Sequence, residues 1–263
     1  MKKIIAMMLA LVMCFALVAC GGSSDDSAND AGFTTAVEGK LYVATNVAFP
    51  PYEYYEGTEA VGIDMDIARA IGEKLGLEVV IEDMEFDAIN ESVKSGKSDV
   101  GFGGMTVTPE RAEIIDFTTS YATGVQVVIV PEDSAITSVD DLFAEGASTI
   151  IGVQRNTTGD LYTTWDLEDA GLATIDRYSK GADAVQALIA GKVDCVVIDN
   201  EPAKAFVAEN EGLKILETAY ALEEYAASVS KDNPELYAAI NGALEELIAD
   251  GTVAAIVAKY IPA

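Results

Sequence analysis

Residues 61–76 read VGIDMDIARAIGEKLG, and this stretch decides the fold class of the 263-residue chain. Apolar residues recur every four positions from 67 to 75, which predicts an amphipathic helix, and the closing glycine is typical of a helix end. Asp64 is the predicted N-cap of this helix. Runs rich in strand-forming residues flank it at 41–45 and 78–82. Strand, helix and strand in this order predict an α/β fold.

The alternation of strands and helices falls into two series, with a break near residues 121–125. The second series contains predicted strands at 125–130, 149–153, near 175 and at 195–199, and predicted helices from 158 and over 179–190. Two such series predict two lobes, because each can bury a core of its own. A strand at 226–230 and two helices follow, opened by Pro234 and capped by Thr252. Periodicity alone does not assign this last segment to either lobe.

The first twenty residues are typical of an export signal. Two lysines precede an apolar run over 4–19 that is too short for a confident membrane span. The run ends in LVAC (17–20), which resembles the lipobox of bacterial lipoproteins, where cleavage precedes an acylated cysteine. We therefore predict a signal peptide at 1–19 and a lipid on Cys20. An uncleaved anchor helix is the alternative interpretation.

The segment after this signal is predicted to be a flexible tether. Residues 20–38 are rich in Gly, Ser, Asp and Asn and show no apolar period, so the folded part is expected to begin near Gly39. Within the folded part only Cys195 remains, in the apolar run 193–198. It is predicted to be a buried strand residue rather than a nucleophile, since the chain contains no histidine to activate it.

The charge and composition of the chain argue against nucleic acid as a partner and against a zinc site. The formal net charge is −28 and would become −30 once Lys2 and Lys3 left with the signal, so nucleic acid would be repelled. The acidic residues are scattered along the chain, which favours a role in solubility. With no histidine and one remaining cysteine, a zinc site is not expected, and no cofactor is predicted.

A lone arginine in the stretch 101–117, GFGGMTVTPERAEIIDF, is a candidate anion-binding group. Thr108 is the predicted N-cap of a short helix, with proline next and Arg111 at the third helical position. The glycine pair 103–104 lets the preceding backbone approach a ligand closely. A guanidinium beside free amides suits a carboxylate. An exposed ion pair between Arg111 and a neighbouring glutamate is an equally good interpretation of the spacing.

Six ordered motifs carry a family resemblance that covers residues 39–263. They are ATNVAFPPYEY (44–54), VGIDMDIARAIGEKLG (61–76), SDVGFGGMTVTPERAEIIDFTTSY (98–121), IGVQRNTTGD (151–160), DCVVIDNEPA (194–203) and NGALEELIADGTVAAIVAKY (241–260). With these motifs the chain resembles the polar amino-acid family of extracytoplasmic solute-binding proteins, the ligand-capturing components of ABC importers. The resemblance implies a two-lobed, periplasmic-binding-protein-like α/β fold of type II, with two hinge strands and the ligand in the interlobe cleft.

The resemblance also implies the division of the chain between the lobes. Lobe 1 would contain residues 39–121 and, after a second crossing, 225–263. Lobe 2 would contain residues 122–224, with a hinge strand at each end. Lobe 1 would therefore be discontinuous in sequence.

The family's ligand clamp maps onto charged residues of both lobes. Arg111 matches the arginine that holds the α-carboxylate, and Asp199 matches the acidic residue that binds the α-ammonium. Without the resemblance, Asp199 would be interpreted as a helix N-cap, because it ends an apolar strand just before a helix. The remaining matches in the clamp are Thr106, Thr157 and Thr158, which assist at the carboxylate, and Gly104, whose carbonyl faces the ammonium.

Four further matches surround the ligand side chain. Phe49 and Phe86 match aromatic walls, although Phe49 could equally belong to the core. Asn46 and Gln154 match positions that tune specificity, and because both are neutral they do not favour a basic ligand. Three nearby acidic residues are expected on the solvated surface, with a charge at the cleft rim as the alternative: Glu53, Glu56 and Glu85.

The resemblance implies a binding protein and not an enzyme. The expected function is capture of a polar amino acid and delivery to an ABC permease with its ATPase, by a monomer anchored through lipid outside the cytoplasm. Closure of both lobes on the zwitterion would pair each of its charges. Some relatives with this fold are cyclohexadienyl dehydratases acting on prephenate or arogenate, which is one alternative. A sensor domain that presents its closed form to a receptor is another.

Overall fold

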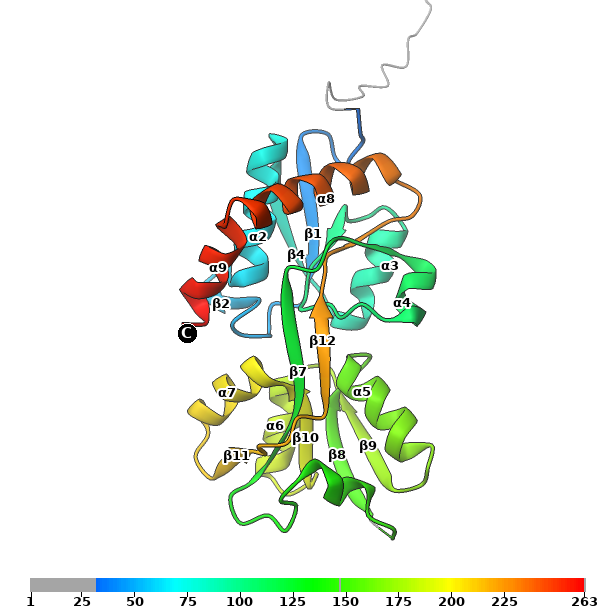
Figure 1. The fold of residues 1–263 in the computed structure, drawn as a ribbon, viewed down its shortest axis with the longest axis vertical. Helices are drawn as coiled ribbons and strands as arrows, with labels where there is room; N and C mark the ends of the chain where they lie inside the picture. The colour runs from blue at the N-terminus through cyan, green and yellow to red at the C-terminus, as the bar shows by residue number, and fades with distance from the viewer. Residues whose placement is uncertain (1–31, 147, 263) are drawn as a thin grey trace, which may run out of the picture.

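The computed structural model describes residues 32–146 and 148–262 (Figure 1). The chain forms two α/β lobes, each built on its own sheet, so the predicted fold class is confirmed. The predicted signal peptide at 1–19, the lipid on Cys20 and the tether up to residue 31 lie outside the described residues. Across the described ranges, no helix has both the length and the apolar character that crossing a bilayer requires.

Lobe 1 is built on a five-stranded sheet in the order β4-β1-β5-β13-β6. Its strands are β1 (Lys40–Thr45), β4 (Glu78–Asp83), β5 (Val100–Gly101), β6 (Asp116–Phe117) and β13 (Ser228–Val229), with a separate hairpin of β2 (Tyr54–Glu56) and β3 (Glu59–Val61). Strand β1 pairs in parallel with β4 and β5, whereas β13 is antiparallel to β5 and β6. The helical elements are α2 (Ile63–Leu75), η1 (Phe86–Ala88), α3 (Ile89–Lys94), α4 (Pro109–Ile114), α8 (Pro234–Ala249) and α9 (Thr252–Tyr260).

Lobe 2 is built on a six-stranded sheet in which β11, β7, β10, β8 and β9 lie in that order and β12 also pairs with β7. These strands are β7 (Ala122–Pro131), β8 (Thr149–Gln154), β9 (Ala173–Tyr178), β10 (Cys195–Asp199), β11 (Leu213–Ile215) and β12 (Ala221–Tyr225). The helical elements are η2 (Val139–Phe143), α5 (Thr158–Thr163), the π-helical turn η3 (Thr164–Glu168), α6 (Gly181–Ile189) and α7 (Asn200–Glu209).

Two antiparallel strands, β7 and β12, connect the lobes (Figure 1). Strand β7 carries the chain out of lobe 1, and β12 carries it back. The returning helices α8 and α9 lie against α2, where Lys74 reaches Glu246 at 2.7 Å and Lys259 reaches Asp66 at 2.8 Å. The last segment, which periodicity did not place, therefore belongs to lobe 1.

Two of the predicted helix caps are wrong. The N-cap of α2 is Gly62, not Asp64, because only glycine suits its φ of 127°. Asp64 lies in the first turn of α2, where it is fully buried and its Oδ2 accepts the Gly104 N–H at 2.8 Å. The N-cap of α9 is the left-handed Gly251, and Thr252 is its first helical residue. In both cases a glycine occupies the N-cap position that was expected for a nearby polar residue.

The end of the predicted tether packs on lobe 1. Phe33 is 5% exposed and belongs to the hydrophobic core. The Ala36 N–H bonds Asp99 Oδ1 at 2.7 Å, and the Thr34 carbonyl accepts Asn233 Nδ2 at 3.0 Å. Composition did not reveal this contact, because one aromatic anchor among small polar residues produces no periodic signal.

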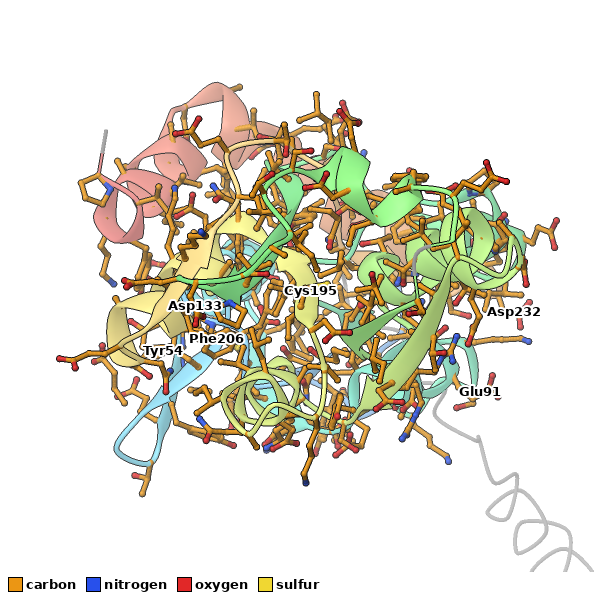
Figure 2. The ribbon with its side chains drawn as sticks, turned by 90° about the horizontal axis from the view of Figure 1, so that it is seen from below. Tyr54, Glu91, Asp133, Cys195, Phe206 and Asp232 are labelled. Carbon is orange, nitrogen blue, oxygen red and sulfur yellow. The ribbon has the colours of Figure 1, made fainter. Side chains whose placement is uncertain are left out.

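The one cysteine among the described residues is buried inside lobe 2. Cys195 is fully buried in β10, which confirms its prediction as a strand residue, and burial raises the pKa of its thiol. Figure 2 shows Cys195 in the middle of lobe 2, while the exposed Glu91 and Asp232 lie toward the periphery.

Candidate functional site

A cavity between the lobes brings together all ten residues predicted to bind a ligand. Its residues line about 300 Å³ of space between atoms, part of which is open to solvent. Its lining consists of Asn46, Phe49, Glu53, Phe86, Gly103, Gly104, Thr106, Arg111, Gln154, Thr157, Thr158 and Asp199. The two other lining residues are Glu53, for which a charge at the cleft rim was the alternative expectation, and Gly103, from the glycine pair expected to approach a ligand.

The cavity lies where strands of both sheets end. In lobe 1, Asn46 follows β1 and Gly104 follows β5, with Arg111 on the next helix, α4. In lobe 2, Gln154 ends β8 and Asp199 ends β10. The carboxyl ends of parallel strands are the usual ligand position in α/β proteins, and here two such edges face each other.

Arg111 is buried, at 7% exposure, at the third position of α4. The hydroxyl of Thr108 caps the helix by accepting the Arg111 N–H at 3.2 Å. Nη1 donates to the Thr106 carbonyl at 2.8 Å, and Nη2 donates across the cleft to the Asn156 carbonyl at 2.9 Å. The guanidinium carbon lies 5.5 Å from the centre of the Phe86 ring. The alternative of an exposed ion pair is therefore wrong.

The glycine turn beside Arg111 is tightly enclosed. Gly104 has a φ of 52°, and a Cβ there would lie 2.9 Å from the Phe49 ring. Its N–H is held by Asp64. A larger residue would therefore displace an aromatic wall of the cavity.

Lobe 2 presents the start of helix α5 to the cavity. Thr157 is the N-cap, and its hydroxyl also donates to the Gln154 carbonyl at 2.8 Å. Thr158 is the first helical residue and is buried, and its hydroxyl accepts Gln126 Nε2 at 3.2 Å. Asn156, just before the cap, has the left-handed φ of 62°.

Asp199 is 6% exposed and occupies the N-cap position of α7 without capping that helix through its side chain. Its carboxyl group instead accepts the Tyr225 hydroxyl. Burial, together with the nearby Glu223 carboxylate, raises the pKa of Asp199. Asp199 is thus the N-cap residue by position, as the sequence predicts, but its carboxyl group bonds Tyr225 and not the helix amides.

A buried polar chain, which the sequence did not reveal, joins the two lobes through the hinge strands. Glu223 on β12 accepts Thr106 Oγ1 and Gln126 Nε2 through Oε2, both at 3.1 Å. Gln126, on β7, also donates to Thr158. Strand β12 places Glu223 and Tyr225 on its inner face and leaves Leu222 exposed, so its sequence carried no signal for this burial.

The two predicted specificity residues bond each other across the cleft. Gln154 Nε2 donates to Asn46 Oδ1 at 3.1 Å, while Asn46 Nδ2 donates to the Met84 carbonyl at 2.8 Å. Phe49 is buried in the core and also lines the cavity, so the two interpretations of this residue do not exclude each other.

Glu53 was expected at the solvated surface but is 1% exposed and lines the cavity. Its backbone pairs with that of Phe49 through bonds of 2.7 and 3.1 Å, which fold the segment back toward the cleft. Glu56 and Glu85 are exposed, as predicted. No hydrophobic period distinguishes Glu53 from these two, so only the turn geometry reveals its burial.

Comparisons with known proteins agree along nearly the whole chain. The sequence model of the family described as bacterial extracellular solute-binding proteins, family 3, matches residues 41–263. The arginine-binding extracellular protein ArtP of Bacillus subtilis is 30% identical over 262 residues, covering 99% of this chain and 98% of that protein. A probable histidine-binding protein of Neisseria gonorrhoeae is 30% identical over 265 residues, covering 99% and 96%. The structure of an ancestral arginine-binding protein bound to arginine is similar, with a TM-score of 0.79, 37% identity and coverage of 85% and 98%.

Proposed function

This chain belongs to family 3 of the bacterial extracellular solute-binding proteins, and we propose that it captures a polar amino acid outside the cytoplasm for delivery to an ABC permease and its ATPase. The observation that carries the proposal is the placement of a buried guanidinium and a buried carboxyl group in one cavity. Arg111 comes from lobe 1 and Asp199 from lobe 2. An amino acid has the matching pair of charges on one carbon atom.

Arg111 binds the α-carboxylate in this proposal. A guanidinium has five N–H donors. Two hydrogen bonds occupy Arg111, to the carbonyls of Thr106 and Asn156, and the remaining donors are available for a carboxylate. Thr157 and Thr158, at the start of α5, add amides from the other lobe.

Asp199 binds the α-ammonium, with the Gly104 carbonyl facing the same group. Both charges of the ligand are then paired in a site closed to water, and a molecule lacking either charge would leave a buried group unpaired. The ligand contributes contacts to both lobes, which is what stabilises the closed arrangement.

The ligand side chain is most consistent with a cation. The cavity is lined by two carboxyl groups, on Glu53 and Asp199, but by a single guanidinium, on Arg111. The neutral pair Asn46 and Gln154 gave no such preference. We therefore place L-arginine first among the candidates, in keeping with the name of the similar Bacillus protein.

Calorimetry with L-arginine and two truncated analogues tests this function. Agmatine lacks the α-carboxylate and 5-guanidinopentanoate lacks the α-ammonium, so both should bind at least tenfold more weakly than L-arginine. A thermal-shift screen of the standard amino acids identifies a different ligand if L-arginine is not bound, since a ligand raises the melting temperature. A flat screen would contradict the proposal.

A dehydratase is the second candidate, because a cleft carboxyl group with a raised pKa could act as a general acid. Binding requires Asp199 as an ammonium partner, and this use accounts for its position opposite Arg111. Incubation with prephenate and arogenate separates the two functions. Appearance of a dehydrated, decarboxylated product would favour the enzyme.

The sequence of the first twenty residues supports a proposal for where the protein is located. We propose that the mature chain lies outside the cytoplasm and is held by a lipid on Cys20. We also propose that it is a monomer. Replacement Cys20→Ala should release the protein from membranes, and gel filtration should give the mass of one chain. Retention of the variant in the membrane fraction would argue for an uncleaved anchor helix.

A further inference from the structure

Glu53 is a buried cavity residue whose neighbouring side chain is another acid, Asp64, and not a cation. Neither of its carboxyl oxygens receives a hydrogen bond from the part of the chain that the structure describes. A buried, unpartnered ionised carboxylate is costly, because it has lost its hydration. Glu53 lines the ligand cavity, so a bound molecule can reach this group.

The neighbour of Glu53 is a second buried carboxyl group, on Asp64. Asp64 is the better stabilised of the two, since its Oδ2 accepts the Gly104 N–H at 2.8 Å and Tyr121 lies beside it. Burial raises the pKa of Asp64 to about 6, whereas burial and Asp64 together raise the pKa of Glu53 well above its usual range. Two adjacent carboxyl groups in a dry site do not both ionise. The proton therefore resides on Glu53.

The groups that face this pair are acidic or neutral. Asp199 approaches from lobe 2 and raises the pKa of Glu53 further. The phenols of Tyr52 and Tyr121 face the same carboxyl groups, and burial raises the pKa of each, so they stay neutral. Asp199 is itself flanked by Glu223 and Tyr225. Arg111, the one cationic residue of the cavity lining, is bonded to Thr106 and Asn156.

We propose that Glu53 binds a positively charged group of the captured amino acid and releases its own proton to solvent when it does so. The inference rests on the proposed function. The proton leaves the Glu53 carboxyl group for the buffer, the cationic group of the ligand keeps its protons, and no other bond changes. A ligand cation supplies the positive partner that the lining residues of the protein do not supply.

Two groups of the ligand have the required chemistry, the α-ammonium and a cationic side chain. L-Glutamine has the first alone, and L-arginine has both. If replacing Glu53 by Gln reduces proton release with L-arginine but not with L-glutamine, the side chain lies at Glu53. If the replacement reduces release equally with both ligands, the α-ammonium lies there, beside Asp199.

The exchange makes affinity depend on pH in a defined direction. Because ligand binding releases one proton, the association constant rises by about tenfold per pH unit, up to the pKa of Glu53 in the empty protein. Above that pKa the proton is already absent, and the dependence ends. The Glu53→Gln variant lacks this proton, so its affinity should depend on pH less steeply than that of wild type, and the dependence that remains belongs to Asp199.

Infrared spectroscopy of the empty protein tests the first half of the inference without any ligand. The carbonyl stretch of a protonated carboxyl group should be present at neutral pH and should decrease in Glu53→Gln. The matched control is Glu56→Gln, three positions further on an exposed strand, which should leave the band unchanged. Equal bands in wild type and Glu53→Gln would overturn the proposal.

Calorimetry of L-arginine binding in phosphate and in Tris tests the second half. These buffers differ in ionisation enthalpy, so the difference in heat counts the protons released. We expect wild type and Glu56→Gln to release about one proton more than Glu53→Gln, because Asp199, whose pKa burial raises to about 8, contributes a release common to all three. Binding by Glu53→Gln should be at least tenfold weaker at neutral pH. If Glu53→Gln does not fold, Asp64→Asn replaces it, and removing the neighbouring charge should shift the release to lower pH.

The outcomes separate this inference from the proposed function. Binding of L-arginine without proton release, or release of the same number of protons by wild type and Glu53→Gln, overturns the role of Glu53 and leaves amino-acid capture intact. Absence of binding by all standard amino acids overturns the proposed function and with it the exchange, even if the infrared band is present.

Discussion

The two lobes hold their cavity residues in different ways. In lobe 1 the key groups are held largely by their own lobe, since Arg111 Nη1 bonds the Thr106 carbonyl and the Gly104 N–H bonds Asp64, although Arg111 Nη2 also reaches across the cleft to Asn156. In lobe 2 the key groups are fixed by hinge residues. Asp199 bonds Tyr225 of β12, and Thr158 bonds Gln126 of β7. Lobe 1 is therefore a preformed half-site, whereas the half-site of lobe 2 depends on the hinge.

The largest expected effect comes from breaking the preformed half. Replacement Arg111→Ala removes the carboxylate partner, and losing one member of a buried ion pair costs about 3–5 kcal/mol, or more than a hundredfold in affinity. Calorimetry with L-arginine measures the loss. The control is Arg155→Ala, which removes a half-exposed arginine 3.6 Å from Asp87 and should change affinity by a few-fold at most. Wild-type affinity in Arg111→Ala would show that lobe 1 does not hold the carboxylate.

The pH dependence of stability probes the buried acid of lobe 1. Burial raises the pKa of Asp64 to about 6, while an unfolded aspartate titrates near pH ~4. As pH rises the unfolded chain releases its proton first, so this group lowers the free energy of unfolding between about pH 4 and about pH 6, by at most about 3 kcal/mol. Urea unfolding of ligand-free wild type and Asp64→Asn should therefore diverge across this window, with wild type losing stability relative to the variant. Parallel curves would contradict the raised pKa.

The smallest effect is expected at the hinge. Replacement Gln126→Ala removes the donor shared by Glu223 and Thr158, and one buried hydrogen bond contributes about 1 kcal/mol, or about fivefold in affinity. Stopped-flow binding should assign the loss to faster dissociation, because affinity differences between variants of one site lie mostly in the dissociation rate. The exposed Gln186→Ala, also in lobe 2, is the matched control. An unchanged dissociation rate would mean that lobe 2 does not rely on the hinge.

Sequence reasoning identified the groups that lie at the ends of elements. Asn46, Gln154 and Asp199 end or follow strands, and Arg111 and Thr158 open helices, so their positions follow from local patterns and from family motifs. All of them line the cavity. The assignment of ligand roles to these residues stays a prediction until binding is measured.

The residues that sequence reasoning missed are polar groups buried by tertiary structure. Glu53 lies in a turn without periodicity, and Gln126 and Glu223 lie on strands that pair only after the chain has left lobe 1 and returned. A charged residue in such a position is normally exposed, and only the opposing surface decides otherwise. The same reason explains Asp64, whose carboxyl group serves the Gly104 turn instead of its own helix.

The position of β13 has a consequence for how the chain folds as it is made. This strand, Ser228–Val229, lies between β5 and β6 in the sheet, although more than a hundred residues separate it from β5 in sequence. Most of the lobe 2 sheet is encoded without interruption between these points and can assemble once it has been synthesised. Lobe 1 has to keep a gap in its sheet until the last part of the chain closes a long loop, at an entropic cost that grows slowly with loop length. The lobe that holds the preformed half-site is thus the last to be completed, and its slow closure should dominate the refolding rate.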